Sequence, residues 1–567
     1  MSMETVAANG RVWYHPGHSS NPNQPERGPP LPAFPHMEKN LDSISALCKR
    51  AGFIFPSSEI YGGLNGFWDY GPMGSELKRN IRDAWWHYTV QWREDVVGLD
   101  ATIIMNPRIW EASGHVGGFA DPMVDCKDCK KRHRADQLCE EQGLKLIQEG
   151  KAWKLPEGCK CTACGSKNLT EPRSFNLMFK TYVGPVEDDS AVAYLRPETA
   201  QAIFAQFLNI VPTSRKKVPF GVAQSGKSFR NEINPRNYTF RSREFEQMEL
   251  EFFIRPDEAV ELICGHVATL ADNPDLNGEP QEDWGWEVWH KYWVERRLEW
   301  YRLAGLPQED LHLYWQTKEE LAHYARACVD IEYAFPFGVQ ELEGIAARSN
   351  FDLSQHEKFS GKSMTVQDDR LRLACAEKSD EEKAAFKAKV VADWVSRGKT
   401  QFDAEAFVDL LFQGKYVPHV IEPSAGTDRL ALALICNAYD EEKLVDAKGK
   451  EDVRTVLRFS PAIAPVKVAV LPLVKNNEAL RAKARGLYKA LQRKWKCAWD
   501  ETGAIGRRYR RQDEIGTPFC VTVDFDTLGE EKPELKDTVT VRLRDSMEQL
   551  RMPIAELVPY IEKAILL

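Results

Sequence analysis

Charged residues of both signs are concentrated in one stretch, FRNEINPRNYTFRSREFEQME, at positions 229–249. Two clusters in it combine arginine with glutamate, the first at Arg230 and Glu232 and the second at 243–246, and a polar turn around Pro235 separates them. Arginine suits phosphate because it can donate two parallel charged hydrogen bonds, and carboxylates suit ammonium groups. The stretch could therefore bind a ligand that carries both charges, such as an amino acid joined to a nucleotide. A surface hairpin with solvated ion pairs is the alternative.

The pattern of the same stretch predicts two antiparallel strands joined by a long loop. Polar and apolar residues alternate strictly from position 247 to position 252. This alternation is typical of a strand with one buried face. The polar face would carry arginines near the loop and carboxylates further in.

Two further segments place charged residues at predicted helix starts. In YLRPETAQ (194–201), Glu198 opens a helix, where a carboxylate is usually a cap. In VPHVIEPSAGTDRLA (417–431), Arg429 lies in the first helical turn. An arginine there is unfavourable against the helix dipole unless an anion binds beside it, and Gly426 lets the backbone approach a ligand closely. The second segment therefore favours a site for a terminal phosphate.

Cysteine spacing gives a separate signal. Cys126-x-x-Cys129 and Cys161-x-x-Cys164 are two thiol pairs on tight turns, and such pairs could surround a tetrahedral structural zinc. Cysteines that hold no metal are the alternative. The chain has thirteen cysteines, an odd number, with several in these pairs. That usage favours a reducing compartment, and we expect a cytoplasmic protein.

The motifs resemble those of a known family. FRNE followed by FRSREFEQMELEFF is similar to motif two of class II aminoacyl-tRNA synthetases, and the segment around Arg429 resembles motif three. GFIFPSSEIYGGLNGFWDYGPMGSELK, MNPRIWEASGHVGGFADP, YLRPETAQ and YVPHVIEPSAGTDRL narrow the resemblance to the dimeric glycyl-tRNA synthetases. It covers nearly everything except the first 36 residues.

This resemblance implies an α+β catalytic domain built on an antiparallel sheet, with insertions, and a C-terminal α/β anticodon-binding domain. It implies a glycine–tRNA ligase that activates glycine with ATP and transfers it to the 3′ end of its tRNA. A homodimer is also implied, with the predicted helix after Gly71-Pro72, which continues to Trp92, at the interface.

The resemblance also implies site residues. Arg230 and Arg429 would be catalytic, and Glu341 would hold the magnesium that accompanies ATP, since Mg²⁺ prefers carboxylate and phosphate oxygens. ATP would be bound by Arg230, Asn231, Glu232, Phe240, Arg241, Ser242, Arg243, Glu244, Phe245, Glu341, Leu342, Gly426, Thr427, Asp428 and Arg429. Glycine would be bound by Arg134, Glu198, Phe245, Glu246, Gln247, Met248, Glu249, Arg348, Glu422, Pro423, Ser424, Ala425 and Gly426.

Composition divides the chain into three parts. Residues 1–36 contain seven prolines and predict a disordered extension. Residues 37–460 would form the catalytic domain, with insertions at about 120–190, 256–330 and 355–415. Residues 461–567 would form the anticodon-binding domain, where two apolar strands flank a helix and predict a largely parallel sheet.

The charge distribution fits an RNA partner locally. The net charge is −9, but positions 467–511 hold thirteen Lys/Arg against three Asp/Glu, and GRRYRR (506–511) adds an aromatic that could stack on a base. A solvated helix face is the alternative. No apolar run approaches the roughly 20 residues needed to cross a bilayer, so no membrane is expected.

Two other function classes fit parts of the sequence. A catalytically inactive relative that serves as a binding subunit should have lost Arg230 and Arg429, and both are present. An ATP-dependent ligase for a different acceptor would lack the basic C-terminal domain. Pyrophosphate exchange that depends on glycine would separate these classes.

Overall fold

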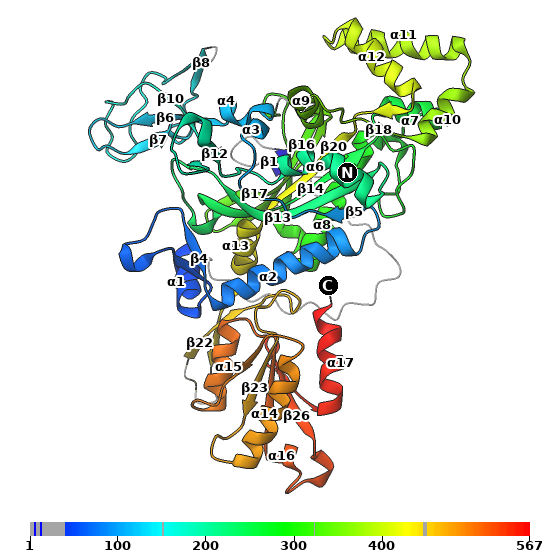
Figure 1. Cartoon of the computed structure of the whole chain (residues 1–567). Helices are drawn as coiled ribbons and strands as arrows, with labels where there is room; N and C mark the ends of the chain where they lie inside the picture. Colours follow the sequence, from blue (N-terminus) through cyan, green and yellow to red (C-terminus); the bar gives the residue numbers. More distant parts are fainter. Residues whose placement is uncertain are drawn as a thin grey trace.

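The structure is a computed structural model that describes residues 5–6, 12–13, 40–149, 152–322, 324–445, 449 and 451–566. A large body built around a central sheet carries two protruding lobes, and the C-terminal domain extends from the opposite side (Figure 1). Most of the predicted extension at 1–36 lies outside the described residues. Within it, β1 (Thr5–Val6) pairs antiparallel with β2 (Val12–Trp13).

The central sheet has seven strands in the order β15-β16-β17-β20-β14-β13-β5. All neighbours are antiparallel except β13 and β5, so the predicted antiparallel sheet is confirmed. The strands are β5 (Val96–Gly98), β13 (Phe220–Phe229), β14 (Glu244–Ile254), β15 (Leu311–Trp315), β16 (Ala327–Phe335), β17 (Gly338–Ser349) and β20 (His419–Gly426).

The predicted hairpin is formed by β13 and β14, with Gly226 opposite Gln247 in the register. Met248 lies on the apolar face of β14, which packs on the main core with α2 (Pro72–Trp86), α8 (Trp286–Ala304) and α13 (Thr427–Ala438). The polar face is buried as well, with Glu249 only 2% and Glu251 0% exposed. The predicted single buried face is therefore incomplete, because α6 (Ala200–Ser214), α7 (Asp257–Cys264) and α9 (Phe351–Ser360) contribute to a second core on the other side of the sheet.

Helix α2 (Pro72–Trp86) runs beneath the sheet, between it and the C-terminal domain (Figure 1). Proline at its first position suits a helix start, because the missing N–H would have no helical partner there. The helix continues as a π-helix at His87–Gln91, so the predicted helix to Trp92 is nearly complete. The tryptophan-rich segment forms α8 (Trp286–Ala304), which packs on the main core.

Two lobes protrude from the body (Figure 1). The first has a three-stranded sheet in the order β10-β6-β7 and one short helix. The second is helical. The first lobe comprises β6 (Ala120–Asp125), β7 (Arg132–Arg134), α5 (Ala135–Glu140) and β10 (Arg173–Asn176), and the second comprises α10 (Asp369–Glu377), α11 (Asp380–Ser396) and α12 (Gln401–Phe412).

The C-terminal domain has five strands in the order β24-β23-β25-β26-β27. The first three are parallel, but the last two pair antiparallel, so the sheet is mixed rather than largely parallel. Its elements are β23 (Val468–Pro472), α14 (Glu478–Gln492), β24 (Cys497–Trp499), α15 (Ile505–Glu514), β25 (Phe519–Val523), α16 (Phe525–Leu528), β26 (Thr538–Leu543), β27 (Gln549–Pro553) and α17 (Ile554–Ile565).

The basic segment GRRYRR lies in α15. Arg508 is buried and donates to the carbonyl oxygens of Pro472 and Gly503. The Tyr509 ring is half-buried beneath the guanidinium of Arg542, 4.8 Å from the ring centre. This guanidinium covers one face of the ring, and stacking of a base on Tyr509 stays a prediction.

A hairpin connects the catalytic body to this domain. Helix α13 (Thr427–Ala438) leads directly into β21 (Tyr439–Val445), which pairs with β22 (Glu451–Leu457). Arg454 on β22 is fully buried, and its Nε lies 2.9 Å from Asp513 on α15. Arg542 on β26 also contacts Asp513, at 2.8 Å. One buried carboxylate thus joins three elements.

Candidate active site

A cleft of about 150 Å³ opens where the β13–β14 hairpin, β17 and the start of α13 meet. Arg230 and Arg429 both line it although they are far apart in the sequence. The lining residues are Arg230, Glu232, Thr239, Phe240, Arg241, Ser242, Phe245, Glu246, Gln247, Glu341, Leu342, Ser424, Gly426, Asp428 and Arg429. The hairpin and the helix start therefore bring two sets of predicted residues into one cavity.

Arg230 is fixed by its surroundings. Its Nε donates to the carbonyl oxygen of Pro197 at 3.0 Å, and its guanidinium lies 5.3 Å from the centre of the Phe245 ring and 5.4 Å from that of Phe119. Cation–π contacts of this kind restrict the position of the guanidinium group. Its remaining N–H groups suit an anion in the cleft.

The other cleft arginines hold carboxylates. Arg241 Nε lies 2.8 Å from Glu232, and Arg429 Nη1 lies 3.2 Å from Glu341. Arg429 also covers the Phe240 ring, 4.6 Å from its centre. A triphosphate could replace the two carboxylates as the partner of both guanidinium groups, and Glu341 would then be free to bind a cation.

A cluster of carboxyl groups lies next to the cleft, linked to it through Ser424. The Ser424 hydroxyl donates to Glu249 at 2.6 Å, and the backbone N–H of Thr199 donates to the same carboxylate at 2.9 Å. Burial and the charge of Glu198 raise the pKa of Glu249, although the hydrogen bonds from the hydroxyl groups of Ser424 and Thr199 act in the opposite direction. The cluster consists of Glu198, Glu249, Glu251, Asp352 and Glu422.

Glu198 is not a helix cap. Thr199 is the N-cap of α6, and no side chain caps that helix. Glu198 instead contacts His115 Nε2 at 3.2 Å and accepts from Gln201 at 3.1 Å. Burial would raise the pKa of Glu198, but the contact with His115 and the charges of two arginines hold that pKa well below its usual range. This carboxylate is therefore ionised and suits an ammonium group.

Glu251 is the opposite case. It is fully buried, and neither carboxyl oxygen has a hydrogen-bond partner among the described residues. Burial, together with a neighbouring carboxylate, raises the pKa of both Glu251 and Glu422. Because Glu422 also contacts Arg348 at 2.7 Å, we assign the proton to Glu251. Glu251 is then a neutral carboxylic acid at neutral pH.

Arg348 is bonded to carboxylates in this structure, and its predicted contact with a glycine carboxylate stays a prediction. It is 4% exposed, and it makes two bonds to Asp352, at 2.8 and 2.9 Å, and one to Glu422. Its observed contacts position Glu422. Arg134 likewise pairs with Asp121 at 3.0 Å and is not among the residues that line the cleft.

Strand parity separates two of the predicted glycine-binding residues from Glu249. Glu246 and Met248 lie on the face of β14 opposite Glu249, because successive side chains alternate. Met248 is buried in the main core, and Glu246 pairs with Lys78 at 2.9 Å. Asp428 pairs with the same lysine at 2.8 Å. Glu246 and Asp428 border the cleft, but Lys78, which lies behind the cleft, compensates their charges.

Several of the predicted residues do not line the cleft. Arg243 donates to backbone carbonyl oxygens of Glu232 and Asn65 and borders a separate hollow. Pro423 and Ala425 alternate with Ser424 and point to the other face of β20. The predicted residues absent from the cleft lining are Arg134, Asn231, Arg243, Glu244, Met248, Pro423, Ala425 and Thr427, with Glu198, Glu249, Arg348 and Glu422 behind Ser424.

Sequence reasoning missed Lys78, His115 and Glu251. Lys78 had a visible signal, since it falls on the apolar face of α2 between Leu77 and Ile81, which are both fully buried. A lysine on a buried face needs a charged partner. Nothing in the sequence distinguishes His115 or Glu251 from a surface residue.

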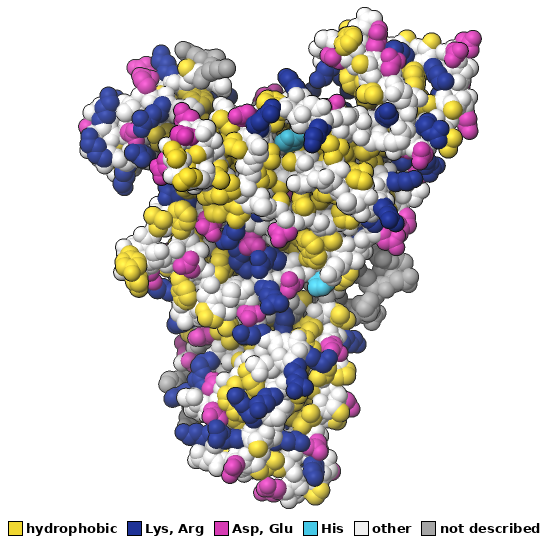
Figure 2. Space-filling view, viewed as in Figure 1, with side chains coloured by type: hydrophobic (Ala, Val, Ile, Leu, Met, Phe, Trp, Pro, Cys, Tyr) yellow, Lys and Arg dark blue, Asp and Glu magenta, His cyan; other side chains and the backbone are white. Residues whose placement is uncertain are grey.

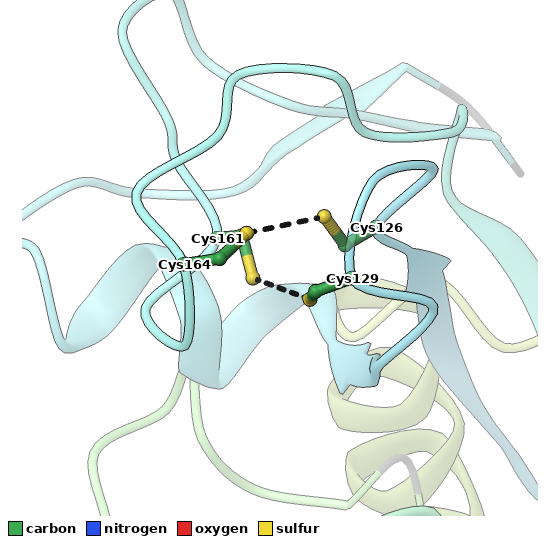
Figure 3. Close-up of side chains that lie close together, drawn as sticks. All are labelled: Cys126, Cys129, Cys161 and Cys164. Carbon is green, nitrogen blue, oxygen red and sulfur yellow. Dashed lines mark hydrogen bonds between the residues drawn. The ribbon is translucent and has the colours of Figure 1, made fainter.

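The four predicted cysteines meet in the first lobe (Figure 3). Their sulfur atoms all lie within 4.8 Å of one another. Cys126 lies 3.6 Å from Cys164, and Cys129 lies 3.6 Å from Cys161. Four thiolates about 2.3 Å from a tetrahedral zinc would have sulfur atoms about 3.8 Å apart, so the cluster fits this metal.

Comparison with solved structures supports the architecture. The crystal structure of prolyl-tRNA synthetase from Cryptosporidium parvum, complexed with halofuginone and AMPPNP, matches with a TM-score of 0.52 and 13% identity. The match covers 93% of this chain and 77% of that chain. The antiparallel sheet with its arginine-lined cleft is therefore the fold of a class II aminoacyl-tRNA synthetase.

Sequence comparisons narrow the class. Residues 467–564 match the family described as "Anticodon binding domain", and residues 121–154 match "Glycyl-tRNA synthetase insertion domain 1". The glycine–tRNA ligase of Acetivibrio thermocellus is 46% identical over 93% of this chain and 98% of its own length, and that of Thermobifida fusca is 45% identical over 92% and 97%. The chain belongs to the glycine–tRNA ligase family, so the resemblance seen in the sequence is confirmed. Among the described residues, no helix has the length and apolar character to cross a membrane.

Proposed function

We propose that this chain joins glycine to its tRNA in two steps at the cleft, with Arg230 and Arg429 on the phosphates and Glu198 on the glycine ammonium. Family membership supports the overall reaction with ATP and Mg²⁺. The observation that carries these roles is that Arg230 and Arg429 line the same cleft as Ser424, whose hydroxyl is bonded to the carboxyl cluster. Phosphate-binding cations thus lie beside ammonium-binding carboxylates.

In the first step, a carboxylate oxygen of glycine attacks the α-phosphorus of ATP. The bond from that phosphorus to the bridging oxygen breaks, and pyrophosphate leaves. Arg230 stabilises the charge that develops on the α-phosphate, while Arg241 and Arg429 hold the outer phosphates and Phe245 stacks on adenine. Magnesium, when bound at Glu341, supplies further charge screening of the phosphates.

In the second step, the terminal ribose hydroxyl of tRNA attacks the adenylate carbonyl, and AMP leaves. The ammonium group of glycine remains bound to the ionised carboxylates, chiefly to Glu198. Glycine needs no side-chain pocket. Carboxylates close to its α-carbon exclude larger amino acids by steric contact and charge.

The RNA would be held by two basic surfaces. A hollow of about 640 Å³ lies between the cysteine cluster and the β13–β14 loop, lined by Lys130, Lys131 and Arg132 among others. Lys and Arg side chains are also spread over the visible face of the C-terminal domain (Figure 2). Such surfaces attract phosphodiesters without reading bases.

Glycine-dependent exchange of pyrophosphate into ATP tests the proposal. Glycine should support exchange, alanine and serine should not, and the charged product should be tRNA bearing glycine. Equal exchange with alanine would contradict the glycine site, and exchange without tRNA charging would point to another acceptor.

We also propose a homodimer in the cytoplasm. Ile60 and Tyr61 lie in the short 3-10 helix Glu59–Tyr61 and are each 87% exposed, and Leu64 in the segment that follows is 59% exposed. Large apolar side chains grouped in one exposed loop are typical of a surface that another chain covers. The thirteen free thiols are in keeping with a reducing compartment.

The cysteine cluster should hold one structural zinc per chain. Cys161→Ser should remove the metal and make residues 121–176 sensitive to protease, because four thiolates organise this lobe. Elemental analysis of the purified full chain measures the zinc. The control is Cys139→Ala, because the sulfur of Cys139 lies 4.0 Å from that of Cys159 and does not belong to the cluster of four. Wild-type protein without zinc, or zinc retained in the Cys161 variant, would contradict the assignment.

A further inference from the structure

A buried lysine lies behind the cleft. The Lys78 side chain on α2 is 8% exposed, and its ammonium nitrogen lies 2.8 Å from Asp428 Oδ1 and 2.9 Å from Glu246 Oε2. It also sits 4.4 Å from the centre of the Tyr70 ring. Helix α2 supplies no residue to the cleft lining, so this contact connects the helix to the site from outside.

The two carboxylates adjoin the residues that would bind ATP. Asp428 directly precedes Arg429 in the first turn of α13, and Glu246 directly follows Phe245 on β14. Asp428 Oδ2 also accepts the backbone N–H of Glu246 at 2.7 Å. The helix start and the strand are therefore joined directly, and Lys78 bridges their two side chains.

The charges in this group depend on one another. Burial would lower the pKa of Lys78, but the two carboxylates outweigh burial and raise it. Burial would raise the pKa of Asp428 and of Glu246, but Lys78 helps to lower both. Arg82 also compensates Glu246, at 2.8 Å, whereas Asp428 has no second ion pair among the described residues. Without the lysine, Asp428 would be a buried carboxylate without an ion pair and would keep mainly its hydrogen bond from the backbone N–H of Glu246, so its position would be less firmly held.

We propose that Lys78 is a positioning residue for adenylate formation. Through Asp428 and Glu246 it fixes Arg429 relative to Phe245, and hence the site of the outer phosphates relative to the site of adenine. The inference rests on the proposed function of the cleft. Lys78 itself contacts neither substrate, and the glycine-facing Glu198 lies outside this group.

The test compares Lys78→Met and Lys78→Gln with Arg79→Met in the full chain. Arg79 is next along the same helix, and its side chain is 70% exposed. In glycine-dependent exchange, kcat/KM for ATP should fall about 30-fold in Lys78→Met, because a small displacement of bound groups is costly to the rate. KM for glycine should stay within threefold of wild type. Lys78→Gln keeps one N–H donor for Asp428, so its kcat/KM for ATP should lie between those of Lys78→Met and Arg79→Met.

Burst-phase titration of adenylate counts the folded sites, so each rate is expressed per active site. A lysine that only stabilises the fold would lower the number of sites and leave KM for ATP unchanged. That result would overturn the proposal. Equal rates in Lys78→Met and Arg79→Met would also overturn it, and so would the failure of both Lys78 variants to fold. Wild-type enzyme without glycine-dependent exchange would instead contradict the function itself.

Discussion

An Arg230→Ala variant should fold normally and lose about 10³-fold in kcat for glycine-dependent pyrophosphate exchange, or about 4 kcal/mol of transition-state stabilisation. The guanidinium is held between the Phe119 and Phe245 rings and by the carbonyl oxygen of Pro197, so it meets the α-phosphate without rearrangement. Steady-state exchange at saturating ATP and glycine measures the loss.

The matched control is Arg236→Ala. Arg236 lies on the same loop, but its side chain is 46% exposed, and it makes a long 3.8 Å contact with Glu141. Its loss should change the exchange rate less than twofold. An Arg230 variant within tenfold of wild type would show that charge at the α-phosphate is stabilised elsewhere.

The second large effect concerns glycine. Glu198→Gln should raise KM for glycine about 100-fold, because a charged hydrogen bond to the ammonium contributes about 1.5–3 kcal/mol. The pKa of Glu198 lies well below its usual range, so the native group is ionised at every working pH. Exchange at varied glycine concentration gives KM, with kcat measured in the same series.

Glu251→Gln makes the same chemical change in the same cluster and should behave differently. If Glu251 already carries a proton, an amide replaces a neutral group, and KM for glycine should stay within threefold. A rise as large as that in Glu198→Gln would show that Glu251 is ionised. A Glu198 variant within threefold of wild type would remove that residue from the glycine site.

Local patterns predicted the elements of the site well. Alternation after position 247 gave β14, and the arginine in the first turn of α13 indicated an anion site, because both signals depend on neighbours in the sequence. What the polar face of β14 contacts could not be predicted in this way. It is covered by helices from distant segments, α6 and α9.

The missed contacts have the same physical origin. The pairs of Lys78 with Asp428 and of Arg348 with Glu422 join residues far apart in the chain, and a charged residue can satisfy its charge either with a ligand or with another side chain. The sequence shows that Arg348 and Glu246 are charged. Only the packed structure shows that their partners are already inside the protein.

The hairpin after α13 makes residue 460 a poor place to divide the protein. Cutting there would separate Arg454 on β22, which is fully buried in the whole chain, from Asp513 and would leave it only its pair with Glu442 at 2.7 Å. It would also expose to water the face of the hairpin that packs on the C-terminal domain. A shortened chain that lacks the C-terminal domain would also need a redesigned hairpin, and this hairpin follows directly after α13, the helix that carries Arg429.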